Sequence, residues 1–126
     1  MHLTADELSI LVRARELLLD PGHCVFGVSS CDDSGNHLKP GDPRATHWDI
    51  LGAIARFSPN GLISYNTLRH VDECIKVLEP VLTEDFTFEV LYDQTFTHER
   101  IVEFLDLMLA RASNPPIPSV GSTQDL

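Results

Sequence analysis

The stretch that decides the fold is residues 42–57, DPRATHWDILGAIARF. Asp42 has the side chain of a helix N-cap, and Pro43 follows at the first helical position, where its missing N–H costs nothing. The apolar residues after it keep helical spacing in two adjacent stripes, which are Trp48, Leu51, Gly52 and Ala55, and Ile50, Ile54 and Phe57. Apolar surface on most sides predicts a helix enclosed by other segments. Gly52 inside it indicates that another backbone passes close by.

The chain has 126 residues, which fits one domain with a real hydrophobic core. We expect a single compact domain over residues 1–112. Residues 113–126 are rich in proline and serine and have little to bury, so they predict a flexible C-terminal tail.

Composition restricts the compartment and the partner. Three cysteines, no secretory signal and no long apolar run predict a cytoplasmic protein with reduced thiols and no membrane contact. Nineteen acidic residues against nine basic ones give a net charge of -10, which argues against direct nucleic-acid binding. That charge fits plain solubility or a partner with a basic surface.

A first helix is predicted after a capping box, in which Thr4 is the N-cap and Glu7 is the third helical residue. Asp20-Pro21-Gly22 should end this helix. Its apolar residues are Leu8, Leu11, Val12, Leu18 and Leu19.

Two more helices are predicted in the second half of the chain. Ser64 or Asn66 can cap one of them, which Pro80 should end or kink, and Thr97 can cap the last. Their inward residues are Leu68, Val71, Ile75 and Leu78, and then Ile101, Phe104, Leu105, Met108, Leu109 and Ala112.

The β content is expected to be small. Cys24–Val28 is β-prone, residues 32–36 are turn formers, and His37–Lys39 could return antiparallel, so this region predicts a small hairpin or an ordered loop. Alternation over residues 86–92 favours one further extended segment. The predicted fold class is α+β, predominantly α, with about four helices around a central buried helix.

Several of these motifs resemble those of a family of small bacterial and phage proteins that is known only as a domain of unknown function. The matching residues are the Asp32–Gly35 turn, Pro43, Trp48, Gly52, Ala53, Ile54, Arg56, Tyr92, Thr97 and His98. Asp93-Gln94 departs from the family's Asn-Asp pair at the corresponding place. The resemblance implies a mostly helical fold and a bacterial or phage setting, and it supplies no activity.

The sequence contains no complete metal-binding motif and no redox-active cysteine motif. His70 and Cys74 are four residues apart on one helix face, but no third ligand is fixed by spacing, so we expect a partly buried cysteine beside a surface histidine. Cys24 and Cys31 match no zinc or redox spacing and are interpreted as structural. No cofactor motif is present, and the Asp32 turn lacks the later ligands of a calcium loop.

One polar cluster is a candidate binding site. The beginnings of the two helices near residues 48 and 98 could converge and bring together His47, Trp48, Arg56, Tyr92, Asp93 and His98. A histidine held by a carboxylate is the usual general base, but no nucleophile motif accompanies it. These side chains could equally cap helices and pair with one another.

Three functions remain open. We favour a small non-catalytic interaction or regulatory protein whose acidic surface binds a basic protein, for example as an inhibitor of a nucleic-acid-binding protein. The alternatives are a small-molecule-binding domain with a pocket near Trp48, Tyr92 and His98, and a hydrolase-like enzyme that uses His98 with Asp93.

Overall fold

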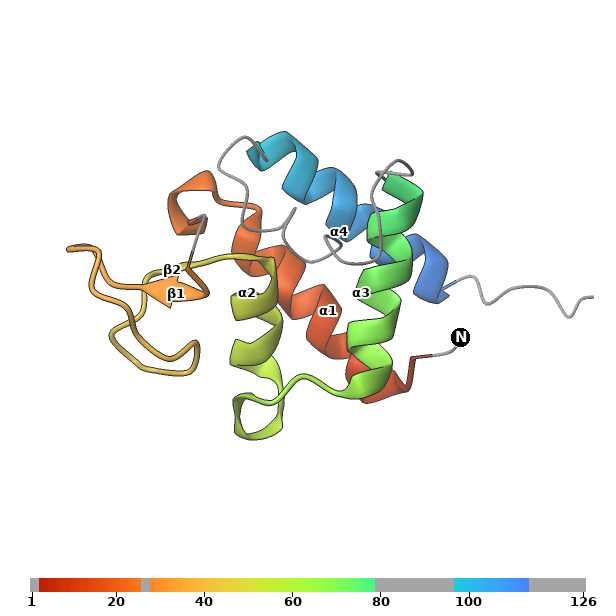
Figure 1. Cartoon of the computed structure of the whole chain (residues 1–126), viewed down its shortest axis with the longest axis horizontal. Helices are drawn as coiled ribbons and strands as arrows, with labels where there is room; N and C mark the ends of the chain where they lie inside the picture. Colours follow the sequence, from red (N-terminus) through yellow and green to blue (C-terminus); the bar gives the residue numbers. More distant parts are fainter. Residues whose placement is uncertain (1–2, 26–27, 79–96, 114–126) are drawn as a thin grey trace, which may run out of the picture.

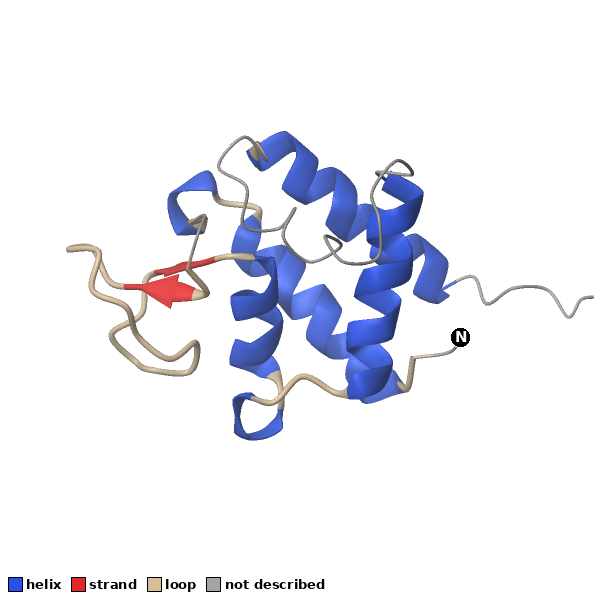
Figure 2. Ribbon diagram, in the orientation of Figure 1, coloured by secondary structure: helices blue, strands red, loops and turns tan. Residues whose placement is uncertain are grey.

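The computed structural model describes residues 3–25, 28–78 and 97–113 (Figure 1). Helices dominate the described chain, and a two-stranded antiparallel sheet lies beside them (Figure 2), which confirms the α+β, predominantly α class. The elements are α1 (Ala5–Leu18), β1 (Ser30–Cys31), β2 (His47–Trp48), α2 (Ile50–Phe57), α3 (Tyr65–Leu78) and α4 (His98–Ser113), with short 3₁₀ turns η1 (Pro21–His23) and η2 (Pro59–Gly61).

Helix α1 packs against both α2 and α4, and α3 packs against α4. In Figure 1, α1 crosses the middle of the molecule between α2 and α3, while the sheet and its loops extend to one side. The helices therefore enclose one shared core, and no helix in the described ranges is long and apolar enough to span a membrane.

The start of α1 is the predicted capping box. Thr4 Oγ1 accepts a hydrogen bond from the Glu7 amide at 3.1 Å, and the Glu7 carboxylate accepts one from the Thr4 amide at 2.8 Å. The expectation that Val12 and Leu19 face the core is wrong, since both are exposed. They lie one residue past Leu11 and Leu18, and a helix turns by about 100° per residue, so they point away from the buried stripe.

The predicted start of the central helix is wrong. Helix α2 begins at Ile50, and its N-cap is Asp49, whose Oδ1 accepts from the Gly52 amide at 2.6 Å. Asp42 instead accepts from the Arg44 amide at 2.9 Å and closes a local turn. Residues 47–48 are extended because Trp48 pairs with Ser30 in the sheet and is buried there. This tertiary contact outweighs the helix propensity of residues 42–49.

The burial of α2 is confirmed by five buried residues out of eight, Ile50, Gly52, Ala53, Ile54 and Ala55. Its predicted place as the central helix is wrong, because α1 is the helix that packs against both α2 and α4. The close backbone at Gly52 is also confirmed. A Cβ on Gly52 would lie 1.8 Å from the Ser29 carbonyl oxygen, so only glycine fits this contact.

The sheet pairs Ser30 with Trp48 and Cys31 with His47. The predicted pairing of Cys24–Val28 with His37–Lys39 is therefore wrong, because His37 forms an isolated bridge with Cys31 and Cys24 forms one with Trp48. Such short strands have little stability of their own and pair where the buried Trp48 anchors them to the helices.

Helices α3 and α4 begin at sequence-predicted caps. Ser64 rather than Asn66 caps α3, since Ser64 Oγ accepts from the Thr67 amide at 3.1 Å. Thr97 Oγ1 accepts from the Arg100 amide at 3.3 Å at the start of α4. The predicted extended segment at residues 86–92 and residues 114–126 of the predicted tail lie outside the described residues. Ser113, the first residue of the predicted tail, is instead the last residue of α4.

The core combines residues from every helix. Its fully buried large side chains are Leu11, Leu18, Ile50, Ile54, Val71, Ile75, Ile101, Phe104, Leu105 and Met108. The predicted inner stripe of α4 is confirmed at its four largest positions, while Ala112 and Leu109 are only partly buried.

Candidate functional site

Trp48 lies at the end of β2, only 4% exposed. Its indole N–H donates to the Pro40 carbonyl oxygen at 3.0 Å, and the His23 ring meets it edge-on at a centroid distance of 6.1 Å. A buried tryptophan needs a partner for its N–H, and Pro40 supplies it. Trp48 thus fastens the loop before β2 to the body of the molecule.

Arg56 on α2 completes what we call the Trp48–Arg56 cluster, formed by Trp48, Arg56, Phe57 and Pro40. The guanidinium carbon of Arg56 lies 4.9 Å from the Trp48 ring centroid and 5.8 Å from that of Phe57. Its Nη1 also donates to the Pro40 carbonyl at 3.4 Å. A cation over an aromatic face contributes about 0.5–2 kcal/mol, so the cluster joins loop, strand and helix.

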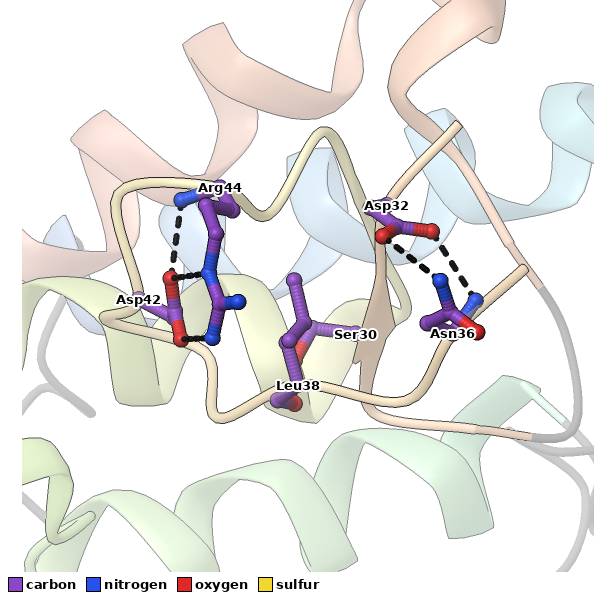
Figure 3. Close-up of polar contacts among 6 residues, drawn as sticks. All are labelled: Ser30, Asp32, Asn36, Leu38, Asp42 and Arg44. Carbon is purple, nitrogen blue, oxygen red and sulfur yellow. Dashed lines mark hydrogen bonds and ion pairs between the residues drawn. The ribbon is translucent and has the colours of Figure 1, made fainter. Parts of the chain in front are cut away.

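The loop between β1 and β2 is held by its own side chains (Figure 3). Asp32 accepts from the Ser34 and Asn36 amides and from the Asn36 side chain, at 2.9–3.0 Å. These bonds, led by that of the Asn36 side chain, lower the pKa of Asp32. The Ser30 hydroxyl donates to the Leu38 carbonyl across the loop.

An ion pair between Asp42 and Arg44 also stabilises this loop, with 2.9 Å between Asp42 Oδ2 and Arg44 Nη2 (Figure 3). The hydrogen bonds from the Arg44 side chain and amide lower the pKa of Asp42 to about 2. The carboxylates of Asp32 and Asp42 are thus engaged within the loop that carries them.

His98 and His47 have separate partners. His98 Nε2 donates to the Leu18 carbonyl at the end of α1, at 2.9 Å, and His47 Nδ1 lies 2.8 Å from the Thr46 hydroxyl. In residues 3–25, 28–78 and 97–113, no hydrogen bond or ion pair joins His98 to His47 or Arg56. Of the predicted cluster, the structure brings Trp48 and Arg56 together, while Tyr92 and Asp93 lie outside the described residues.

His70 is not a surface histidine as expected. It is buried, and its Nε2 donates to the Met108 carbonyl of α4 at 2.7 Å. Cys74 lies 3.8 Å from the same nitrogen, and burial raises the pKa of its thiol to about 11. The described part of the chain holds no group of three side chains suited to a metal.

The other two thiols are also structural in their surroundings. Cys24 Sγ donates to the Leu18 carbonyl at 3.5 Å, and burial, followed by the charge of Asp20, raises its pKa to about 11. Burial, with the charges of Asp32 and Asp33, also raises the pKa of Cys31. Thiols with raised pKa values are poor nucleophiles at neutral pH.

Asp49 is the ionisable residue that sequence reasoning missed. It is 1% exposed, and burial raises its pKa to about 7, although the hydrogen bond from Gly52 opposes that shift. The signal in the sequence was an N-cap residue directly before the apolar run ILGAI, masked by the equally good cap at Asp42.

The exposed face of α4 is acidic. Glu99, Glu103 and Asp106 follow one another at helical spacing and line an open hollow of about 510 Å³ with His98 and Val102. Arg100 pairs with Glu103 at 2.9 Å, and Arg15 of α1 pairs with Asp106 at 2.6 Å. Glu103 and Asp106 are thus paired with arginines but stay more than half exposed, at 57% and 54%, and Glu99 is a third exposed carboxylate on this face.

Comparisons of the chain with protein-family models, curated proteins and solved structures found no match. The resemblance to small bacterial and phage proteins therefore stays a prediction that depends on the short motifs quoted above.

Proposed function

We propose that this chain is a non-catalytic interaction protein that binds a basic protein partner through an acidic helical surface. The observation that carries the proposal is the exposed face of α4, where Glu99, Glu103 and Asp106 line one open hollow. Opposite charge speeds the encounter of two proteins and excludes wrong partners. An inhibitor that occupies the nucleic-acid channel of a basic protein is one form of this function.

The use of the histidines and cysteines supports a non-catalytic role. His23, His70 and His98 each hydrogen-bond to a main-chain carbonyl, and Cys24 and Cys74 have raised pKa values. These contacts give the histidines a structural role in joining elements, and thiols with raised pKa values are poor nucleophiles at neutral pH.

The balance of charge supports an acidic binding surface. All nine lysines and arginines of the chain fall within residues 3–25, 28–78 and 97–113. Five of them pair with acidic residues, in Arg15–Asp106, Arg44–Asp42, Arg69–Glu73, Lys76–Asp72 and Arg100–Glu103. Arg13 and Arg56 lie over aromatic rings, so most of the positive charge is already engaged within the chain.

The test is salt-dependent capture of proteins from a nuclease-treated lysate by the immobilised chain. We expect proteins of high isoelectric point to bind at about 50 mM salt and to be released at about 300 mM, because screening weakens contacts between exposed charges. The double variant Glu99→Gln with Glu103→Gln should lose most of this binding.

The matched control is Asp6→Asn with Glu16→Gln, which removes the same charge from exposed positions on α1. This variant should bind as the wild type does. Capture of nothing basic at low salt, or equal losses from the two double variants, would rule out the α4 face as the binding surface.

A further inference from the structure

The Asp49 carboxyl is buried with only half of its hydrogen bonding satisfied. Oδ1 accepts from the Gly52 amide at 2.6 Å, whereas Oδ2 has no partner among residues 3–25, 28–78 and 97–113. The residue is 1% exposed, so bulk solvent does not reach the carboxyl. An ionised carboxylate in this state carries a large desolvation cost, and protonation removes the charge that is its main cause.

Asp49 occupies the junction between the β-loop region and α2. Its amide donates to the Ser29 carbonyl at 3.1 Å, and its own carbonyl accepts from the Ala53 amide at 2.9 Å. The Ser29 carbonyl also lies against Gly52, where even one extra carbon would collide with it. A change at Asp49 therefore acts directly on the contact between Ser29 and the start of α2.

No described cation neutralises Asp49. On its own helix, Arg56 faces Trp48 and Pro40. In β2, His47 bonds to Thr46. The two cations of α1 are engaged elsewhere, since Arg13 lies over Phe57 and Arg15 pairs with Asp106. The other charged and titratable groups on the packed segments are Asp6, Glu7 and Glu16 of α1, His23 of η1, Cys31 of β1, and Asp32 and Asp33 after it.

We propose that Asp49 is a proton-controlled latch: while its side chain is protonated the junction stays closed, with Ser29 held by the Asp49 amide against the start of α2, and loss of the proton opens this junction while the helices stay packed. The ionised carboxylate gains water only when the junction opens, so the open form binds the proton more weakly than the closed one. A proton then shifts the two populations by that difference in affinity. Burial that raises the pKa of Asp49 to about 7 places the transition near neutral pH.

The test is amide hydrogen exchange at pH 5.5 and pH 8.5, expressed as protection factors and combined with ¹³C NMR of the Asp49 carboxyl. In the wild type, protection of the Asp49 and Gly52 amides should fall at least tenfold as the pH rises. This exchange should be insensitive to low urea concentrations, whereas exchange of the Ile75 amide in α3 should be accelerated by urea, because opening at the junction is local.

Asp49→Asn keeps the cap without the titration, so its protection at Gly52 should change less than twofold between the two pH values. Asp49→Ser is a second neutral cap if the first variant folds poorly, and Asp42→Asn, at a carboxylate already paired in its loop, should behave as the wild type. The latch is refuted if the Asp49 carboxyl titrates at or below pH 4.5. It is equally refuted if Gly52 protection in the wild type is independent of pH, or if its exchange follows urea as that of Ile75 does.

Discussion

Gly52 and Ser29 show at the scale of single residues how α2 is held. The Ser29 carbonyl oxygen occupies the space that any side chain on Gly52 would need, and it also accepts the Asp49 amide. A helix interior normally disfavours glycine by about 1 kcal/mol relative to alanine. At this position the close contact outweighs helix propensity.

We therefore expect Gly52→Ala to lower the free energy of unfolding by roughly 3 kcal/mol, since the new carbon overlaps a main-chain oxygen that cannot move freely. Urea unfolding followed by the fluorescence of Trp48, the single tryptophan, measures the loss. Gly41→Ala is the matched control, because a Cβ there meets nothing within 4 Å, and its effect should stay within about 0.5 kcal/mol. Equal stability of the two variants would disprove the contact.

At the scale of elements, side chains at helix ends join neighbouring segments. Ser64 caps α3 and its hydroxyl also donates to the Glu7 carboxylate of the α1 capping box, to which the Asn66 side chain donates at 2.9 Å. Likewise the Leu18 carbonyl at the end of α1 accepts from both His98 and Cys24. One carboxylate and one carbonyl thus connect helices that are distant in sequence.

The link between α1 and α3 predicts a pH dependence. Hydrogen bonds from Ser64, Thr4 and Asn66 lower the pKa of Glu7 against the opposing effect of burial. Because the folded-state pKa lies below the unfolded one, the stabilisation is present above pH 4.5 and is lost as the pH falls further. Ser64→Ala should cost about 1 kcal/mol at pH 7.

A double-mutant cycle of Ser64→Ala with Glu7→Gln checks this link, because residues in direct contact have non-additive effects on stability. We expect a coupling at pH 7 that becomes smaller as the pH falls and Glu7 is protonated. Additive losses at both pH values would show that the two helix starts are energetically independent.

The sequence predicts elements well where the signal is local. The capping box at Thr4, the cap at Thr97 and the buried stripe through Phe104 and Met108 are all set by neighbours in the chain, and they are confirmed. The start of α2 could not be predicted, because Asp42 and Asp49 are equally good caps. The choice depends on Trp48 pairing with Ser30, a contact across eighteen positions that no local pattern encodes.

In the candidate site, too, contacts between neighbouring elements could be predicted from the sequence, whereas contacts between distant elements could not. Trp48 and Arg56 meet because they lie on consecutive elements, β2 and α2, around one carbonyl. His98 was expected to join them, but its partner is the end of α1, which depends on how α4 packs across the molecule. Asp49 was missed because its raised pKa follows from burial, and burial is a property of the assembled core.

At the scale of the whole molecule, the net charge of -10 and the contacts of the charged side chains both agree with the proposed acidic binding surface. Most positive side chains are engaged in ion pairs and ring contacts, buried histidines and cysteines join the helices, and the acidic side chains of α4 remain on the surface. We therefore assign the buried histidines and cysteines to stability, and we propose that the exposed acidic side chains of α4 bind the partner.

Replacing His98 tests the non-catalytic proposal most directly, because the alternative of a hydrolase-like enzyme relied on His98. Residues kept for chemistry often leave stability unchanged or raise it when they are replaced. A histidine that holds α4 to α1 should do the opposite when it is lost.

The measurement is the urea-unfolding free energy of His98→Ala beside that of His37→Ala, whose side chain is exposed. We expect His98→Ala to lower the free energy of unfolding by about 1–2 kcal/mol, because the hydrogen bond to the Leu18 carbonyl is lost, and His37→Ala to leave it almost unchanged. A His98→Ala protein as stable as the wild type, or more stable, would contradict it.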